Sequence, residues 1–362
     1  MNKLRFIDSL RGIAIIGVIL VHCIDEYTSQ LPKNIVKLIE NGANGVQLFF
    51  IASAFTLFLS MDSRHLKEKH PFTFFFIRRF FRIAPMYYLG IIYYLWQDGL
   101  GARYWLADQS QISVGNIISN FTFTHGVYPY WINSLVPGGW SITVEMTFYL
   151  VLPILFLKIK SFKMAVNFLS LTLILKLILD VILKHNILIQ DNQLWESYLF
   201  LYFPSQLPVF AIGIVFYFMV KQNFVSLSIS NFSILIILSL LLLKGCGLDV
   251  IPSFILFFGV AFLLLGIYLS LTDNLLFVNR VTMYIGEISY SIYLVHFAII
   301  YWLNKLGFFK FLFDSTNENA TAYFLLKFLC ITIIAIIVST ITYRIIELPM
   351  QKIGKKIIGS LT

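Results

Sequence analysis

The segment from Arg11 to His22 places two ionisable side chains at the ends of an otherwise apolar stretch. An α-helix rises about 1.5 Å per residue, so these side chains would lie ~16 Å apart along the axis, about half of a hydrocarbon core. An ionisable group at that depth is costly unless it is paired or hydrated, and histidine is the side chain that titrates nearest neutral pH. The spacing therefore predicts a membrane-buried base at His22.

A group of arginines precedes another apolar run, in the stretch Arg78-Arg79-Phe80-Phe81-Arg82. Guanidinium groups donate paired hydrogen bonds in a fixed plane, which suits phosphate. One interpretation is a binding site for a phosphorylated cytoplasmic donor. The other is an anchor that reaches lipid phosphates on the cytoplasmic side. The sequence leaves both open.

A carboxylate, Glu145, lies about one and a half turns into a further apolar segment that begins Gly-Gly-Trp-Ser. It could orient a base, bind a sugar hydroxyl or pair with an arginine. The alternative is a structural glutamate neutralised by protonation or by a salt bridge. Intramembrane carboxylates are expensive, so the functional interpretation weighs as much as the structural one.

Polar residues recur at helical spacing in the apolar segment 285–303. Ser289, Ile292, Tyr293 and His296 would share one helical face, which must contact protein or a hydrated cavity. Serine and tyrosine there are typical of hydrogen bonding between helices. The role of His296 stays open.

The composition bounds the fold class. Of 362 residues, 59% are hydrophobic and 12% charged, and the mean hydropathy is +0.82. Soluble domains carry about 25% charged residues, so we predict an all-α, polytopic membrane protein. The net charge of +9 lies in short patches between apolar runs, which argues against nucleic acid as a partner. The three cysteines have no metal-binding spacing, and we expect no metal ion.

Apolar segments predict about ten membrane-spanning helices in a single domain. With the N-terminus in the cytoplasm, 18 of the 27 Lys and Arg residues fall on the cytoplasmic side and 7 on the outer side. Both termini are then cytoplasmic and the long 98–139 loop is outside. The predicted spans are 12–28, 43–61, 83–97, 140–157, 164–184, 204–220, 231–243, 251–271, 285–303 and 322–343.

Five motifs in a fixed order resemble the acyltransferase-3 family of membrane acyltransferases. They are Arg11 to His22, the RRFFRIAP stretch, WSITVE, SYSIYLVH and the terminal Glu347-Leu348-Pro349. The resemblance covers residues 3 to 350. One departure is Ala54, where the family commonly has glycine in its second span.

The resemblance implies an O-acyltransferase that moves an acyl group, usually acetyl, from cytoplasmic acyl-CoA to a hydroxyl of a bacterial surface or secreted glycan. It implies His22 as the essential histidine, Arg11 as its basic partner, Arg78, Arg79 and Arg82 as the region that contacts CoA, and Glu145 as a further catalytic position. The enzyme would lie in the bacterial cytoplasmic membrane, against membrane lipids. We expect no SGNH-type hydrolase domain after the membrane domain, so the acceptor would be served by the membrane domain or by a separate partner. The oligomeric state stays open.

Two mechanisms and two rival functions remain open. His22 could deprotonate the acceptor directly, which we favour, or transfer could pass through an acyl-enzyme. A transporter or flippase of a polysaccharide or lipid-linked sugar would also carry intramembrane His and Glu. The two halves of the chain lack the similarity that such transporters often show. A scaffold that senses acyl groups, without turnover, is the third possibility.

Overall fold

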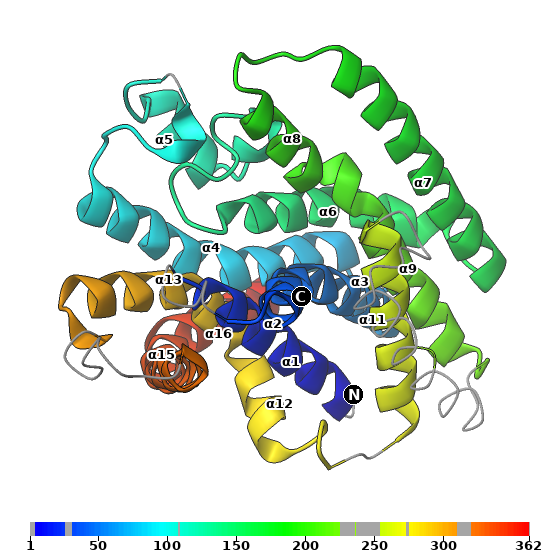
Figure 1. Ribbon diagram of the computed structural model, residues 1–362. Helices are drawn as coiled ribbons and strands as arrows, with labels where there is room; N and C mark the ends of the chain where they lie inside the picture. Colours follow the sequence, from blue (N-terminus) through cyan, green and yellow to red (C-terminus); the bar gives the residue numbers. More distant parts are fainter. Residues whose placement is uncertain are drawn as a thin grey trace. The chain divides into compact units, whose positions relative to one another are not determined.

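The computed structural model describes residues 4–25, 31–107, 109–224, 236, 254–272, 275–309 and 320–361. Every regular element in these ranges is a helix, so the all-α prediction is confirmed (Figure 1). Helices overlap all the predicted spans except 231–243, of which only residue 236 is among the described residues. By length and composition, five helical segments of the described chain could cross a membrane, and a bent pair would be a sixth. The count of ten spans stays a prediction.

The described helices fall into two compact units. Unit 1 comprises Met1–Ala52 and Gln222–Ile345, and unit 2 comprises Ser53–Lys221 and Ile346–Thr362. The chain passes from one unit to the other inside α3 (Gly45–Arg64), and again inside a π-helix (Tyr343–Glu347). The prediction of one domain over 1–362 stays a prediction.

Unit 1 is built around α1 (Arg5–His22). Figure 1 shows α1 beside α12 (Arg280–Glu287), against which it packs most extensively. On another side it contacts the 3-10 helix η2 (Asn41–Asn44), which follows α2 (Lys33–Glu40). It also touches α11 (Phe254–Leu271), α13 (Ser289–Lys305) and α15 (Ala320–Thr342). The helix that carries the predicted base is therefore the core of this unit.

Glycines allow α1 to approach its neighbours backbone to backbone. A Cβ at Gly12 would meet the Thr282 carbonyl oxygen, and a Cβ at Gly286 would meet the Asp8 carbonyl oxygen. At Gly17 a Cβ would lie 3.3 Å from the Gly42 carbonyl oxygen of η2. Small residues that permit such contacts are typical of helix packing in membranes, where dispersion replaces the hydrophobic effect.

The predicted span 285–303 is bent. α12 ends and α13 begins on either side of Ile288, and their axes differ by 76°. The Ser289 hydroxyl donates to the Gly286 carbonyl oxygen (2.8 Å), one of the acceptors that the break leaves without a helical partner. Ser289, Ile292, Tyr293 and His296 lie on the one helix α13 and are all buried, so the face that they share contacts protein, as predicted.

Two boundaries differ from prediction because charged residues were excluded from the apolar windows. α1 begins at Arg5, well before the predicted residue 12, and ends at His22, so the predicted base caps the helix instead of lying within it. α4 (Pro71–Asp98) includes the arginine run that we assigned to a loop. Its first residue is proline, whose fixed φ suits the first helical position.

Unit 2 contains α4, α6 (Gly139–Lys158), α7 (Phe162–His185), α8 (Asn192–Leu201), α9 (Phe203–Lys221) and α16 (Leu348–Leu361). α7 packs on α9, and most of its other apolar side chains are exposed, as expected of a surface in contact with lipid. α16 lies on α4, where a Cβ at Gly354 would be 3.0 Å from the Phe81 Cβ.

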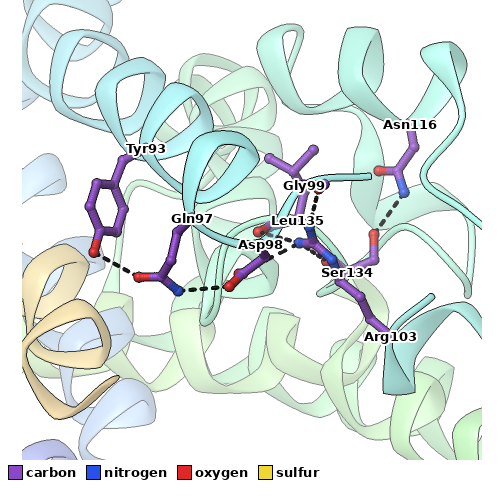
Figure 2. Close-up of polar contacts among 8 residues, drawn as sticks. All are labelled: Tyr93, Gln97, Asp98, Gly99, Arg103, Asn116, Ser134 and Leu135. Carbon is purple, nitrogen blue, oxygen red and sulfur yellow. Dashed lines mark hydrogen bonds and ion pairs between the residues drawn. The ribbon is translucent and has the colours of Figure 1, made fainter. Parts of the chain in front are cut away.

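The segment between α4 and α6 is tied down by polar contacts (Figure 2). Arg103 donates to the carbonyl oxygens of Ser134 (3.1 Å), Leu135 (3.3 Å) and Gly99 (2.5 Å). The Asn116 amide, from the short helix α5 (Val114–Phe121), donates to the Ser134 hydroxyl (2.7 Å). One guanidinium thus joins the two ends of the segment.

His125 lies in the 3-10 helix η4 (His125–Val127) of the same segment and is buried. Its Nε2 contacts the Gly139 carbonyl oxygen (3.0 Å) and the Tyr87 hydroxyl (3.2 Å), so Nε2 carries the proton and donates. The Tyr87 hydroxyl donates to Asn120 Oδ1 (2.8 Å). Burial lowers the pKa of His125 to about 4 from its usual 6.5.

We expect Gly286→Ala to lower the thermal unfolding temperature of the detergent-purified protein by several degrees. The added Cβ must push α12 away from Asp8, and overpacking costs about 1–3 kcal/mol. Gly359→Ala is the control, because nothing lies within 4 Å of a Cβ there and alanine favours a helix. Equal unfolding temperatures for the two variants would contradict the close packing of α1 on α12.

We expect the segment between α4 and α6 to loosen as pH falls from about 6.5 towards 4. In that window the unfolded imidazole binds a proton that the folded His125 does not, so stability is lost, by up to about 3 kcal/mol. Protection factors of residues 114–127 at pH 7 and pH 4.5, which are hydrogen-exchange rates corrected for the intrinsic effect of pH on amide exchange, measure this. The His125→Phe variant cannot titrate, so its protection factors should differ less between the two pH values; a fall as large as in the wild type would refute the assignment.

Candidate functional site

His22, the last residue of α1, is exposed and lies against two aromatic rings of α13. Its ring centroid is 5.4 Å from that of His296 and 4.4 Å from that of Phe297. The His22 imidazole is therefore accessible and also has a polar neighbour, His296. Both histidines belong to unit 1.

His296 is fully buried, and its hydrogen bonding fixes its tautomer. Its Nδ1 lies 3.1 Å from the Ile292 carbonyl oxygen, which can only accept, so Nδ1 carries the proton. The other nitrogen, Nε2, is then an acceptor in the neutral ring, and among the described residues it has no hydrogen-bond partner. Beside His22 there is thus a buried hydrogen-bond acceptor, His296 Nε2, that has no partner among the described residues. The sequence alone left the role of His296 open.

An ion pair fixes the chain directly after His22. Lys327 of α15 is buried and donates to Asp25 Oδ2 (2.5 Å), and the Tyr323 hydroxyl donates to the same oxygen (3.1 Å). No local sequence pattern indicates this pair, because 302 residues separate its members. The cation and the anion together hold the end of α1 against α15.

Arg11 is half-buried on α1. Both Arg11 and His22 lie in one continuous helix, so their predicted separation of ~16 Å along the axis stands. At that distance a direct electrostatic effect of Arg11 on His22 is small.

In unit 2, Glu145 accepts two short hydrogen bonds on one oxygen. The hydroxyls of Ser53 and Tyr149 each donate to its Oε1 at 2.6 Å. Tyr149 stands four residues after Glu145 on α6, a spacing that brings helical side chains together and could have identified it. The carboxylate is thus held by α3 and α6.

Adjacent arginines of α4 have different surroundings. Arg78 forms a bidentate pair with Glu68 (2.9 Å at both nitrogens), whereas the Arg79 guanidinium lies 5.9 Å from the ring centroids of Phe75 and Tyr149. Arg82 is half-buried one turn further along. The structure therefore brings Arg79, Tyr149 and Glu145 together in unit 2, and gives Arg78 a carboxylate partner of its own.

Other predicted features stand as follows. Lys176 and Asp180, four residues apart on α7, form an ion pair. Glu347 of the terminal motif ends the π-helix and is buried, and Pro349 begins α16 with Leu348. Among the described residues, no group of three or more His, Cys, Asp or Glu side chains could hold a metal ion.

We expect Lys327→Met to destabilise the protein by about 2 kcal/mol, because Asp25 would keep its charge without the cation that balances it. Asp25 is 31% exposed, so solvent reduces the cost below that of a fully buried pair. Chemical or thermal unfolding in detergent measures it. Asp25→Asn with Lys327→Met should recover part of the loss, and strictly additive effects would show that the two residues do not interact.

Comparison with known proteins agrees with the arrangement of motifs. The family described as acyltransferase domain matches residues 4–344, nearly the whole chain. No curated protein and no solved structure matches the chain. With its apolar helices and this match, the chain is a multi-pass membrane protein that belongs to the acyltransferase-3 family.

Proposed function

We propose that the protein transfers an acetyl group from cytoplasmic acetyl-CoA to a hydroxyl of a surface or secreted carbohydrate, in the cytoplasmic membrane of a bacterium. Membership of an acyltransferase family supports the class of reaction. The observation that carries the proposal is the accessible His22 ring beside the buried His296, whose Nε2 is an acceptor without a described partner. An imidazole that can reach substrate and has a polar neighbour meets the requirements of a general base.

In the proposed reaction His22 removes the proton of the acceptor hydroxyl as that oxygen attacks the thioester carbonyl carbon. The carbon–sulfur bond then breaks, and His22 returns the proton to the leaving CoA thiolate. The products are an ester and free CoA, so no oxidant or metal is needed. General-base catalysis of this kind contributes about 10²–10⁴-fold in rate.

His296 would position His22. With its own proton donated to Ile292, His296 can only accept at Nε2. A hydrogen bond from the His22 ring, direct or through one water, would leave the second nitrogen of His22 unprotonated and free for the acceptor. Burial of His296 keeps this acceptor away from competing partners.

Arg79 and Arg82 would contact the phosphates of the donor. Arg78 is engaged by Glu68 at both terminal nitrogens, which makes it the weakest of the three candidates. The Arg79 guanidinium lies against two aromatic rings, an environment in which a weakly hydrated planar cation is favoured. Glu145 would hold Tyr149 and so maintain the position of Arg79.

The test uses the full-length protein in lipid nanodiscs with radiolabelled acetyl-CoA and lipid-linked glycans. We expect His22→Ala and His22→Gln to lower label transfer at least about 100-fold, because the base is lost. His185→Gln is the matched control, since His185 is exposed at the end of α7 and its ring contacts the Val181 carbonyl oxygen of its own helix. Near-normal transfer in either His22 variant would refute the mechanism.

The role of His296 is tested in the same assay. His296→Phe preserves ring packing against Phe297, and we expect it to reduce kcat and alter the pH–rate profile while membrane insertion is unchanged.

The same assay separates the rival functions. Movement of unlabelled glycan across the bilayer would indicate a flippase. Absence of both label transfer and movement in the wild-type protein, with all substrates present, would indicate a scaffold.

A further inference from the structure

The segment between α4 and α6 carries an open pocket of about 840 Å³. This volume lies within the range of small-ligand sites, about 300–1,000 Å³. All of its described lining belongs to unit 2. The amides and aliphatic hydroxyls of the lining come from Gln109, Ser110, Gln111, Ser113 and Thr124. The proposed reaction gives this pocket no role so far.

The described lining combines neutral hydrogen-bonding groups with aromatic rings. Amides and hydroxyls both donate and accept, and no described lining residue carries a charge. Tyr128 and Trp131 supply the rings, packed edge to face with centroids 4.8 Å apart. A phosphate would need cations, and an alkyl chain would leave the amides unsatisfied, so this chemistry fits neither.

The aromatic wall is held in place. Trp131 lies over Gly115, where a Cβ would be only 3.2 Å from the indole ring, and its backbone N–H donates to the Tyr128 carbonyl oxygen (3.0 Å). Ser113 caps α5 by accepting from the Asn116 N–H (3.2 Å). A preorganised wall binds ligand without the cost of ordering it.

Backbone contacts also fix the part of the segment that carries Gln111. Gln111 pairs with Gly101 in an antiparallel bridge, and the Ile112 N–H donates to the Leu100 carbonyl oxygen (2.8 Å). The Arg103 contacts in Figure 2 join this part to Ser134 and Leu135, a few residues beyond Trp131. The amide and aromatic sides of the pocket are thus tied to one another.

We propose that this pocket binds a neutral sugar ring of the acyl acceptor. Sugar hydroxyls donate and accept, as the lining amides and hydroxyls do, and the C–H face of a sugar packs on an indole or phenol ring. The proposal rests on the acyl transfer proposed above and names where its carbohydrate substrate is recognised. Trp131 and Gln111 are the principal contacts, as a half-buried aromatic anchor and an exposed amide.

A second pocket of about 530 Å³ adjoins the first, because Thr124 and Val127 line both. Its lining is mainly apolar and includes Val144, Met146 and Leu150 of α6. The sugar could therefore belong to a free glycan or carry a lipid. A free glycan would occupy only the first, polar pocket, whereas a lipid-linked sugar would occupy both pockets.

The experiment measures binding of neutral oligosaccharides, free and polyprenyl-linked, to the full-length protein in nanodiscs without acyl-CoA. A panel of glucose, galactose and N-acetylglucosamine oligomers is read by saturation-transfer NMR and by tryptophan fluorescence. We expect at least one to bind, with Trp131→Ala weakening it about tenfold and Gln111→Ala by several-fold. Trp131→Phe keeps an aromatic wall and should lose less.

Controls separate folding from recognition. Trp96→Phe alters an indole on α4 that is 69% exposed and outside the pocket, so the sugar affinity of this variant should equal that of the wild type.

The probes also distinguish the two sources of the sugar. If only the lipid-linked probes bind, and Leu150→Asp weakens that binding, the acceptor is lipid-linked. If the free probes bind equally well, the acceptor is a free glycan.

Failure of the pocket and failure of the proposed function give different results. If Trp131→Ala weakens sugar binding but the wild-type protein transfers no acetyl group, the proposed reaction is wrong and the sugar-binding pocket stands. Transfer whose acceptor KM is unchanged in Trp131→Ala and in Gln111→Ala overturns the pocket. Absence of binding for the whole panel overturns it as well.

Discussion

The close approach of α1 to α12 sets the position of the proposed base. Where Gly12 meets Thr282 and Gly286 meets Asp8, the two backbones touch without intervening side chains. Contacts of this kind fix both the rotation of a helix and its displacement along its axis, because one added methyl group would separate the helices. The far end of α1, with His22, is placed as a consequence. The Asp25–Lys327 pair then holds that end against α15.

The bend at Ile288 allows one chain segment to serve both ends of α1. α12 packs along the first half of α1, and after a turn of 76° α13 brings His296 and Phe297 to its last residue. A straight helix over 285–303 could not contact α1 at Asp8 and also at His22 unless it ran parallel to it throughout. The capping box of Asn279 and Thr282 at the start of α12 satisfies the amides that so short a helix leaves free. The break is therefore part of the site's construction.

The sequence predicted what depends on local pattern and missed what depends on distant partners. The segment 140–157 agrees with α6 within a residue at each end, and Lys176 pairs with Asp180, because hydropathy and i,i+4 spacing are local. The start of α1 was missed, since Arg5 and Asp8 interrupt the apolar run yet form a helix readily. No periodicity could join Lys327 to Asp25, or Ser53 to Glu145, across 302 and 92 residues. The importance of His296 could be recognised only from coordinates, because the absence of a hydrogen-bond partner for its Nε2 among the described residues is a property of packing.

The arginine run of α4 shows how two interpretations of one motif can apply to different residues. Successive residues on a helix point about 100° apart, so Arg78 and Arg79 cannot share an environment. Arg78 is neutralised by Glu68, at side-chain exposures of 15% and 20%, and this pair can stabilise the start of α4 without any ligand. Arg79 has its Nε buried and its guanidinium beside Tyr149 and Phe75. A lysine or arginine that reaches lipid phosphates extends its charge outwards to water, which a buried Nε contradicts.

Burying the Arg79 guanidinium costs free energy unless a nearby anion offsets the loss of hydration. Glu145, which is held by two hydroxyls, supplies part of that compensation. Both hydroxyls bind its Oε1, and an arginine offers five donors, so the cluster retains capacity for a second anion such as the phosphate of an acyl donor.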